Sequence, residues 1–379
     1  MNPALLKKSA HLHGPVLVVG TGLLGASVGL GLRSRGIDVY LSDASPSAEA
    51  VATDIAAGVP LADAPADLAP ELVVIGAPPD VCGSLVVQAL RRWPHAVVTD
   101  VASVKTAVLD EVRAAAAAST GDDDAVDVRR YVGSHPMAGR ERSGAVSARA
   151  ELFTSAPWVI CPHDDLDPHA YRTVTSLAMD LGGIVTTMEP AAHDEAVALV
   201  SHLPQVVSSL LASRLQDTPA ASLALAGQGL RDVTRIAASD PGLWVQILGA
   251  NAGHLVEPLE GMRADIERLL STLRAPTAPG ARLDMAQLIS EGNVGQARIP
   301  GKHGGPAQQF AWLTVLVDDK PGQIALLLTE IGQLDVNLED MRLGHSAGLP
   351  VGMVEIAVLP SKKQSLVEDL TGRGWKVVA

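Results

Sequence analysis

The stretch Val16-Leu-Val-Val-Gly20-Thr-Gly22-Leu-Leu-Gly25-Ala-Ser-Val-Gly-Leu-Gly-Leu32 determines the fold of the first part of the chain. Four apolar, mostly β-branched residues run into Gly-x-Gly-x-x-Gly, and an apolar segment rich in small residues follows. This order predicts a strand, a tight glycine turn and a helix. The first glycine permits the turn, the second lets a pyrophosphate approach the backbone, and the third lets the helix pack against the strand. The N–H groups at the start of the helix would then hold the phosphates.

A second strand with an acid at its end follows at the spacing that a dinucleotide site requires. Gly36 ends the helix, and Ile37-Asp-Val-Tyr-Leu-Ser-Asp43 has the pattern of a strand. A carboxylate about 20 residues beyond the glycines binds a ribose 2′-hydroxyl and repels a 2′-phosphate. The alternative is a glycine-rich turn in another kind of α/β protein. We predict a nicotinamide or flavin dinucleotide site, with NAD favoured over NADP, made by Gly20, Thr21, Gly22, Leu23, Leu24, Gly25, Asp43, Ala77 and Pro78.

Strands and helices continue to alternate as far as residue 189. Short apolar runs predict strands at 72–75, 96–100, 130–133, 158–161 and 183–188. Helices are predicted at 45–61, where Gly58 would stop the helix, at 81–92, up to about 118, and at 171–181. Apolar strands that alternate with helices indicate a parallel, doubly wound sheet. The first domain is therefore an α/β, Rossmann-like domain over residues 14–189.

Residues 190–300 show helical periodicity and no convincing strand, which predicts an all-helical middle domain. One apolar stripe contains Ala196, Leu199, Val200, Leu203, Val207, Leu210 and Leu211. The opposite arc, with Asp194, Ser201, Gln205 and Ser208, is either a solvent face or, because Pro204 invites a kink, the lining of a cleft. Asp240-Pro241 predicts the start of a long helix over residues 244–270. Long apolar helices often pair between subunits, so we expect a homodimer.

The last part of the chain has the pattern of a small independent domain. Gly301-Lys-His-Gly-Gly-Pro306 has the composition of a linker. Strands at 312–317, 336–343, 351–359 and 375–378, with helices at 322–331 and 362–370, give the order βαββαβ. This order predicts a ferredoxin-like domain over residues 308–379.

Composition narrows the class of protein. The 379 residues, 47% of them hydrophobic, are enough for two or three domains with buried cores. The formal charge of −13 argues against nucleic acid and anionic membrane surfaces as partners. Cys82 and Cys161 give no disulfide framework and no metal-site spacing, which suits a reducing compartment. Apolar runs of about 18 residues without Gly, Pro or charge are not found, and residues 1–14 lack a signal-type core, so we expect a cytoplasmic protein.

With these segments in view, the chain resembles TyrA-type prephenate dehydrogenases, or their arogenate-using relatives, with a C-terminal ACT domain. The resemblance extends from residue 16 to about 378. It rests on the glycine motif and on Asp100-Val-Ala-Ser-Val-Lys105, Gly133-Ser-His-Pro-Met-Ala-Gly139, His193-Asp194, Ser201-His-Leu-Pro204, Leu230-Arg-Asp-Val-Thr-Arg-Ile236, Asp319-Lys-Pro-Gly322 and Asn337.

The resemblance implies NAD-dependent oxidative decarboxylation of prephenate to 4-hydroxyphenylpyruvate in tyrosine biosynthesis. A cyclohexadienol loses hydride and CO2 and becomes aromatic. His135 would accept the proton of the ring hydroxyl, because the pKa of imidazole lies near working pH; its alternative is a structural role in a Ser-His-Pro turn. Ser103 would orient His135 or the hydroxyl, or would cap a helix.

The resemblance also implies a set of substrate-binding residues. Arg231 and Arg235 lie four apart on one helical face, and guanidinium groups match carboxylates, although most such pairs form a solvated face. Relatives often have Lys at position 231 and His at position 205. Gln205 leaves open whether the site prefers the keto acid prephenate or the amino acid arogenate. The implied substrate-binding set is Arg235, Arg231, Ser201, His202, Gln205 and Trp244, of which Trp244 alternatively belongs to the core.

An aromatic amino-acid effector is implied for the C-terminal segment, at Gly322 and Asn337, although a purely structural module is the alternative. Three rival functions stay open at this point. They are an arogenate dehydrogenase, a non-catalytic amino-acid sensor, and an imine reductase of the pyrroline type, which would not need the Ser-His-Pro motif.

Overall fold

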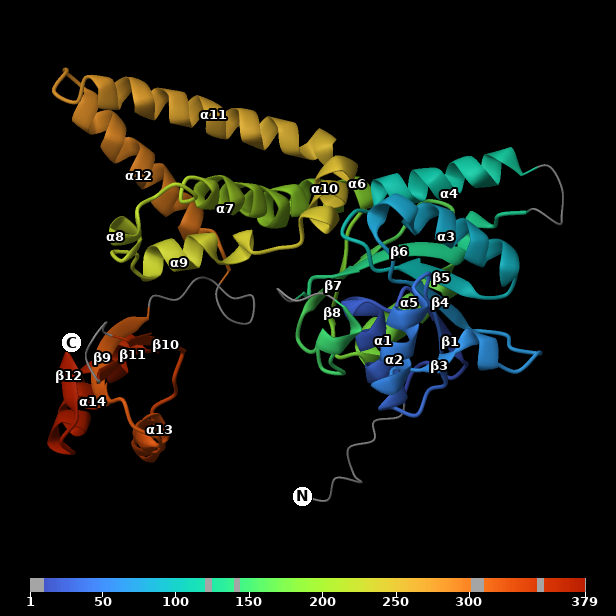
Figure 1. Ribbon diagram of the computed structural model, residues 1–379, viewed down its shortest axis with the longest axis horizontal. Helices are drawn as coiled ribbons and strands as arrows, with labels where there is room; N and C mark the ends of the chain where they lie inside the picture. Colours follow the sequence, from blue (N-terminus) through green and yellow to red (C-terminus); the bar gives the residue numbers. More distant parts are fainter. Residues whose placement is uncertain (1–9, 120–124, 140–143, 301–309, 346–350, 379) are drawn as a thin grey trace. The chain divides into compact units, whose positions relative to one another are not determined.

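The computed structural model describes residues 10–119, 125–139, 144–300, 310–345 and 351–378 (Figure 1). The predicted linker at 301–306 lies outside these ranges. The chain divides into two compact units, residues 1–266 and residues 267–379. The Rossmann-like sheet and most of the helical segment belong to the first unit, and the small antiparallel sheet belongs to the second.

An eight-stranded sheet forms the centre of the first unit (Figure 1). Its order is β3-β2-β1-β4-β5-β6-β7-β8. Every neighbouring pair is parallel except β6 and β7, which are antiparallel, so the prediction of a parallel sheet fails at that pair. Parallel neighbours need a crossover, whereas the described part of the β6–β7 connection contains only the 3₁₀ turn Ala145–Ser147. The strands are β1 Val16–Val19, β2 Val39–Ser42, β3 Val59–Pro60, β4 Leu72–Ile75, β5 Val97–Asp100, β6 Tyr131–Pro136, β7 Pro157–Cys161 and β8 Ile184–Thr187.

Helices cover both faces of this sheet, as Figure 1 shows. Alternate residues of β1 point into two separate cores: Val16 and Val18 into one with α1 and α5, and Leu17 into the other with α3 and α4. A sheet buried on both faces requires strands that are apolar throughout, as Leu72–Ile75 is. The helices are α1 Leu23–Arg33, α2 Pro46–Asp54, α3 Pro79–Arg92, α4 Thr106–Ala118 and α5 Pro168–Asp180.

The predicted helix at 45–61 is wrong beyond residue 54. Ala56 has φ +65°, a left-handed conformation that cannot continue an α-helix, and β3 follows at Val59–Pro60. Gly58 does not stop a helix. A Cβ at Gly58 would lie 2.7 Å from the Leu41 side chain, so glycine there allows the chain to pass close to β2.

The segment after β8 is helical. It contains α6 Pro190–Val197, a π-helical turn Ala198–His202, α7 Leu203–Ser213, α8 Ala220–Leu223, α9 Gln228–Thr234, a 3₁₀ turn Arg235–Ala237, α10 Pro241–Ala250 and α11 Ala252–Arg274. The predicted continuous helix over 244–270 is wrong, because Asn251 separates α10 from α11. The π-helical turn ends at His202, two residues before Pro204, which has no backbone N–H to donate to the preceding turn.

From α6 to α7, polar side chains are buried and apolar side chains are exposed, which is the reverse of an ordinary surface helix. Asp194, Gln205 and Ser208 are buried, whereas Leu199, Val200 and Leu210 are 58–65% exposed. By length and mean hydropathy, 1.4, residues Pro190–Ser213 also resemble a membrane span, although Asp194, Glu195 and Pro204 interrupt the apolar run. The burial of Asp194, Gln205 and Ser208 contradicts a solvent face for the polar arc, and its role as the lining of a cleft stays a prediction.

The second unit has its own core. After α12 Ala281–Ala297, which is longer than the predicted short helix, the elements are β9 Ala311–Asp318, α13 Gln323–Gln333, β10 Asp340–His345, β11 Val351–Val358, α14 Pro360–Gly372 and β12 Lys376–Val378. The antiparallel sheet has the order β10-β11-β9-β12, and Val315, Leu327, Ile331, Val354 and Leu366 lie in its core. Element order and strand order agree with the predicted ferredoxin-like topology.

Candidate active site

The turn after β1 has a shape that only glycine allows. Gly20 has φ +95°, and a Cβ there would lie 2.7 Å from the backbone of Gly76, which follows β4. A Cβ at Gly25 would lie 1.9 Å from the Gly20 carbonyl oxygen. These contacts bring together the loops after β1 and β4, where the strand order of the sheet reverses and where such sheets bind ligands.

Gly22 is different, because it faces open space. An added Cβ there would have no protein atom within 4 Å. Gly22 is also the N-cap residue of α1, and no side chain caps that helix start. Leu23 and Leu24 begin the helix, and Ala77 and Pro78 follow β4 on the adjoining loop. Uncapped N–H groups that face open space at a helix start fit the pyrophosphate of a dinucleotide.

Asp43 is fixed beside this turn. Its carboxylate accepts hydrogen bonds from Thr21 N at 2.6 Å, from Thr21 Oγ1 at 2.9 Å and from Ser45 N at 2.8 Å. The carboxylate is therefore held at the end of β2, next to the glycine turn, as a ribose-binding acid must be. Its role in cofactor choice stays a prediction.

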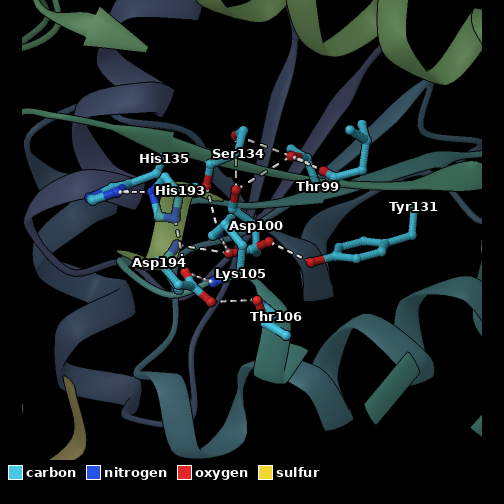
Figure 2. A network of polar contacts seen from close by, with 11 residues as sticks. Thr99, Asp100, Lys105, Thr106, Tyr131, Ser134, His135, His193 and Asp194 are labelled. Carbon is cyan, nitrogen blue, oxygen red and sulfur yellow. Dashed lines mark hydrogen bonds and ion pairs between the residues drawn. The ribbon is translucent and has the colours of Figure 1, made fainter. Parts of the chain in front are cut away.

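A hydrogen-bonded chain of three side chains lies at the carboxyl edge of the sheet. His135 Nδ1 lies 2.9 Å from His193 Nε2, and His193 Nδ1 lies 2.9 Å from Asp194 Oδ1 (Figure 2). The two imidazole rings meet edge to face, with centroids 5.1 Å apart. His135 comes from β6 and the other two residues from α6, so the chain joins the sheet to the helical segment.

Asp194 anchors this chain at the start of α4. It is 2% exposed and accepts hydrogen bonds from the backbone N–H groups of Lys105 and Thr106, each at 2.8 Å. Burial alone would raise the pKa of Asp194, but hydrogen bonds from His193, Thr106 and Lys105 outweigh burial and lower that pKa to about 2. The positive end of α4 favours the same charged form. Asp194 is therefore a carboxylate at neutral pH.

The carboxylate determines where the ring protons lie. Asp194 can only accept, so His193 Nδ1 carries the hydrogen between them. Burial, followed by repulsion from His193, Lys105 and His202, lowers the pKa of His135 well below 6.5. In the neutral pair, His193 Nε2 accepts from His135 Nδ1–H, and the lone pair of His135 lies on Nε2. Among the described residues nothing binds that atom.

Ser103 neither contacts His135 nor caps α4 in the described part of the chain, and its contact with the substrate hydroxyl stays a prediction. It lies on the loop between β5 and α4, but in the described part of the chain no hydrogen bond joins it to His135. Nor does Ser103 cap α4, because the N-cap residue is Lys105. The direct partner of His135 is His193, so the prediction that Ser103 orients His135 has no support from these contacts.

A buried ion pair fixes the strand end that carries His135. Lys105 Nζ donates to Asp100 Oδ1 and, at 2.7 Å, to the carbonyl oxygen of Ser134, which precedes His135 (Figure 2). Tyr131 Oη donates to Asp100 Oδ2 at 2.7 Å, and burial, followed by the Asp100 charge, raises the pKa of Tyr131 well above 10. A buried pair of this kind is costly unless its other hydrogen bonds are made, and here they are.

His202 provides a buried donor on the helical side. Asn251 Nδ2 donates to the Asp194 carbonyl oxygen at 2.8 Å and to His202 Nδ1 at 3.1 Å. A carbonyl oxygen only accepts, so the amide nitrogen of Asn251 is assigned and His202 carries its hydrogen on Nε2. That buried atom has no partner among the described residues. Burial, partly opposed by the Asp194 charge, lowers the pKa of His202 to about 4, and Trp244 packs edge to face on its ring.

The other predicted substrate residues are less closely grouped. Gln205 is buried and accepts from Ser239 Oγ at 3.4 Å, and Ser201 lies in the π-helical turn with His202. Arg231 on α9 and Arg235 on the following 3₁₀ turn are exposed, and neither belongs to the histidine chain. Their role in carboxylate binding therefore stays a prediction.

Sequence reasoning missed the roles of His193, Asp194 and Asn251. The pair His193-Asp194 was part of the motif set, and Asp194 was placed on a polar arc, but neither was assigned a function. The available signal was the position of Asp194, which lies before Pro204 on the arc opposite the apolar stripe.

In the second unit, Gly322 is the N-cap of α13 with φ +88°, and exposed Asn337 donates to Glu339 Oε1 at 3.0 Å. Their role in effector binding stays a prediction.

Comparison with known proteins agrees with this arrangement. Residues 28–187 match the family described as "Prephenate dehydrogenase, nucleotide-binding domain", and residues 189–287 match "Prephenate dehydrogenase, dimerization domain". The chain is 31% identical to "Probable prephenate dehydrogenase NovF" of Streptomyces niveus over 368 residues, which cover 95% of this chain and 98% of that protein.

Two solved structures are similar to the chain. The Aquifex aeolicus prephenate dehydrogenase in complex with hydroxyphenyl propionate and NAD+ has 25% identity and a TM-score of 0.64, with 76% of this chain and 99% of that chain covered. The Synechocystis arogenate dehydrogenase has 27% identity and a TM-score of 0.57, with 74% and 99% covered. The two family matches, the extent of these likenesses and the agreement with the glycine turn and the histidine site lead to one conclusion: the chain belongs to the prephenate dehydrogenase family.

Proposed function

We propose that the protein is an NAD-dependent prephenate dehydrogenase of tyrosine biosynthesis, which converts prephenate to 4-hydroxyphenylpyruvate by oxidative decarboxylation. The observation that carries this proposal is the neutral His135, with its Nε2 lone pair unbound by any described residue, at the same sheet edge as the glycine turn. Family membership and the NAD+ complex of the Aquifex relative support it.

The residues at the sheet edge divide the chemistry between them. A bound NAD would supply the acceptor for the hydride of the ring carbon that carries the hydroxyl. Gly22 and the start of α1 would hold its pyrophosphate, and Asp43 would hold its ribose. His135 would accept the hydroxyl proton at Nε2 as hydride leaves, because a neutral imidazole with a lowered pKa is ready to accept at neutral pH.

The substrate carries two carboxylates, and the helical segment offers groups for them. We assign carboxylate binding to Arg235 on the 3₁₀ turn, together with Arg231 on the preceding helix α9, since guanidinium forks match carboxylates. His202 Nε2–H is a buried donor that suits an acceptor oxygen of the substrate, and Trp244 covers its ring. Ser201 and Gln205 would complete the pocket, and Ser103 would contact the hydroxyl.

The alternative function is that of an arogenate dehydrogenase, which would give tyrosine directly, as the name of the Synechocystis relative suggests. Gln205 hydrogen-bonds without charge and so does not favour either the keto acid or the amino acid. The test is reduction of NAD by the purified protein with prephenate and with arogenate, followed by the absorbance of the reduced cofactor. Turnover of prephenate with higher kcat/KM supports the proposal, whereas a preference for arogenate identifies the alternative. No turnover of either contradicts both and favours a non-catalytic sensor.

We further propose that the protein is a homodimer in the cytoplasm. The exposed apolar side chains of Leu199, Val200, Leu210 and Leu211 lie in the segment that matches a family dimerization domain, and a second subunit would cover them. Two free buried cysteines suit a reducing compartment. Light scattering of the full chain at micromolar concentration should give twice the mass of one chain, and a monomer would contradict the dimer.

We propose that the ferredoxin-like part of the second unit, residues 308–379, is an ACT domain. The other two proposed domains are the Rossmann-like domain at 14–189 and the helical domain at 190–300. Its topology and the Pro321-Gly322 turn before α13 support this reading. An aromatic amino acid would bind near Gly322 and Asn337. Asn337→Ala should then leave turnover unchanged but weaken the response to tyrosine, phenylalanine or tryptophan. If the full chain responds to none of the three, this part of the protein is structural.

A further inference from the structure

We propose that His193 and Asp194 act on His135 as a relay, in which Asp194 fixes the tautomers of both histidines and His193 takes up the positive charge when His135 accepts the substrate proton. His193 and Asp194 are positioning residues in this proposal, and His135 alone touches the substrate. The proposal rests on the proposed function only for its kinetic part, since the tautomers exist in the protein without substrate.

The first argument is the direction of the hydrogen bonds. Asp194 is held by two backbone N–H groups at the start of α4, so its carboxylate cannot turn away from His193. Both ring nitrogens of the fully buried His193 are used, one for Asp194 and one for His135. Each bond fixes the direction of the next. The last atom of the chain, His135 Nε2, is therefore left as a hydrogen-bond acceptor, which is the form that a general base needs.

The second argument is where a transferred proton can go. As the substrate loses hydride, its O–H bond breaks and an N–H bond forms at His135 Nε2. The His135 Nδ1–H bond then breaks, and a new N–H bond forms at His193 Nε2, 2.9 Å away. His135 ends neutral with its hydrogen on Nε2, and the positive charge lies on His193 beside the Asp194 carboxylate. Atoms and charge balance without any further reactant.

The surrounding charges favour this final position. Burial opposes a positive charge on His135, and the Lys105 charge has the same effect. His202, whose pKa is about 4, carries no charge at neutral pH. The Asp194 carboxylate favours a positive charge on His135. The Asp100 carboxylate is already paired with Lys105 and Tyr131. Among the described residues around the chain, Asp194 is thus the negative charge available to the two histidines, and His193 lies in contact with it.

The first experiment needs no substrate. Ring ¹⁵N and ¹H shifts of the full-length protein, labelled at histidine and measured near pH 7, report which nitrogen carries hydrogen. His135→Gln and His193→Gln assign the signals. The relay requires hydrogen on Nδ1 of both rings and a bare Nε2 on His135. Hydrogen on Nε2 of His135 in the free protein would overturn the proposal.

The second experiment compares pH profiles of kcat for wild type, Asp194→Asn and His193→Gln. Asp180→Asn and His163→Gln are matched controls: Asp180 is a buried carboxylate that accepts from His11 and Leu12, and buried His163 contacts the Tyr131 carbonyl oxygen, both outside the relay. Binding of NAD to each variant measures its folded fraction.

Asp194→Asn should lower kcat about 10- to 1,000-fold, a part of what a general base contributes. It should also move the acid limb of the profile down by about one pH unit or more, because the variant loses a nearby opposite charge. His193→Gln should lower kcat by a similar factor with KM within about threefold, whereas the controls keep both kcat and the limb. If Asp194→Asn loses its fold, His193→Gln decides. The relay is overturned if the wild type is active but the two variants keep its acid limb and differ in kcat only as their folded fractions differ. A wild type that is inactive on both substrates would overturn the proposed function alone.

Discussion

Gly22 allows the cofactor site to be tested separately from the stability of the fold. An added methyl group at Gly22 meets no protein atom within 4 Å, and the backbone there, with φ −66° and ψ −164°, is extended. We therefore expect Gly22→Ala to fold like wild type, within about 1 kcal/mol, because the loss of a favourable N-cap glycine and the reduced entropy of the unfolded chain offset each other.

The same methyl group would occupy the space in front of the α1 N–H groups. A pyrophosphate moved away by the methyl group loses one charge-assisted hydrogen bond or more, each worth about 1.5–3 kcal/mol, so Kd for NAD should rise about 10- to 150-fold. Gly25→Ala is the matched contrast, because its Cβ would lie 1.9 Å from the Gly20 carbonyl oxygen. Overpacking of this kind costs up to about 3 kcal/mol, which corresponds to a fall in Tm of about 6–12 °C for a unit of this size.

Calorimetric titration with NAD and a thermal melt of each variant make the measurement. The expected result is weak NAD binding with an unchanged Tm for Gly22→Ala, and a lowered Tm for Gly25→Ala. If Gly22→Ala binds NAD as tightly as wild type, the dinucleotide does not lie against the start of α1, and the reasoning from the open space is wrong.

Four further predictions concern single side chains. Asp43→Ala should erode the preference for NAD over NADP, which a comparison of kcat/KM for the two cofactors measures; equal use of both by the wild type would contradict the role of Asp43. His135→Asn should lower kcat by about 10²–10⁴ with NAD affinity unchanged, and near-normal turnover would remove the histidine from the mechanism. Arg235→Gln should raise KM far more than it lowers kcat, since it removes a charge-assisted hydrogen bond worth about 1.5–3 kcal/mol, and an unchanged KM would place Arg235 outside the site. The pKa of His202 is about 4 in the folded protein and near 6.5 when unfolded, so the unfolded chain binds more protons between these pH values. The free energy of unfolding should therefore have its full value above pH 6.5 and fall by up to about 3 kcal/mol toward pH 4. Urea unfolding at a series of pH values measures this fall, which should be smaller in His202→Leu.

Local features of the sequence were enough to predict the cofactor turn and the small second sheet. The glycine motif, Gly20, Gly22 and Gly25, predicts a strand, a turn and a helix, because contacts within a few residues of chain require glycine there. The alternation of Val315 and Val317 with more exposed neighbours in β9 is likewise a local pattern, and the order of such elements gave the ferredoxin-like topology. Local patterns also gave one wrong prediction, because the run of helix formers in α2 stops at a left-handed Ala56 although the helical pattern continues beyond it.

Tertiary structure decided everything that depends on which distant groups meet. The partner of His135 is 58 residues away in His193, not on the nearer loop with Ser103, because β6 and α6 converge only when the helical segment packs on the sheet. The same packing buries the polar arc of α6 and α7 and leaves Leu199 and Val200 exposed, although periodicity shows only that the helix has two unlike faces. A sequence pattern fixes hydrogen bonds within a turn or a strand, whereas the partner of a side-chain donor is chosen by the packing of whole elements.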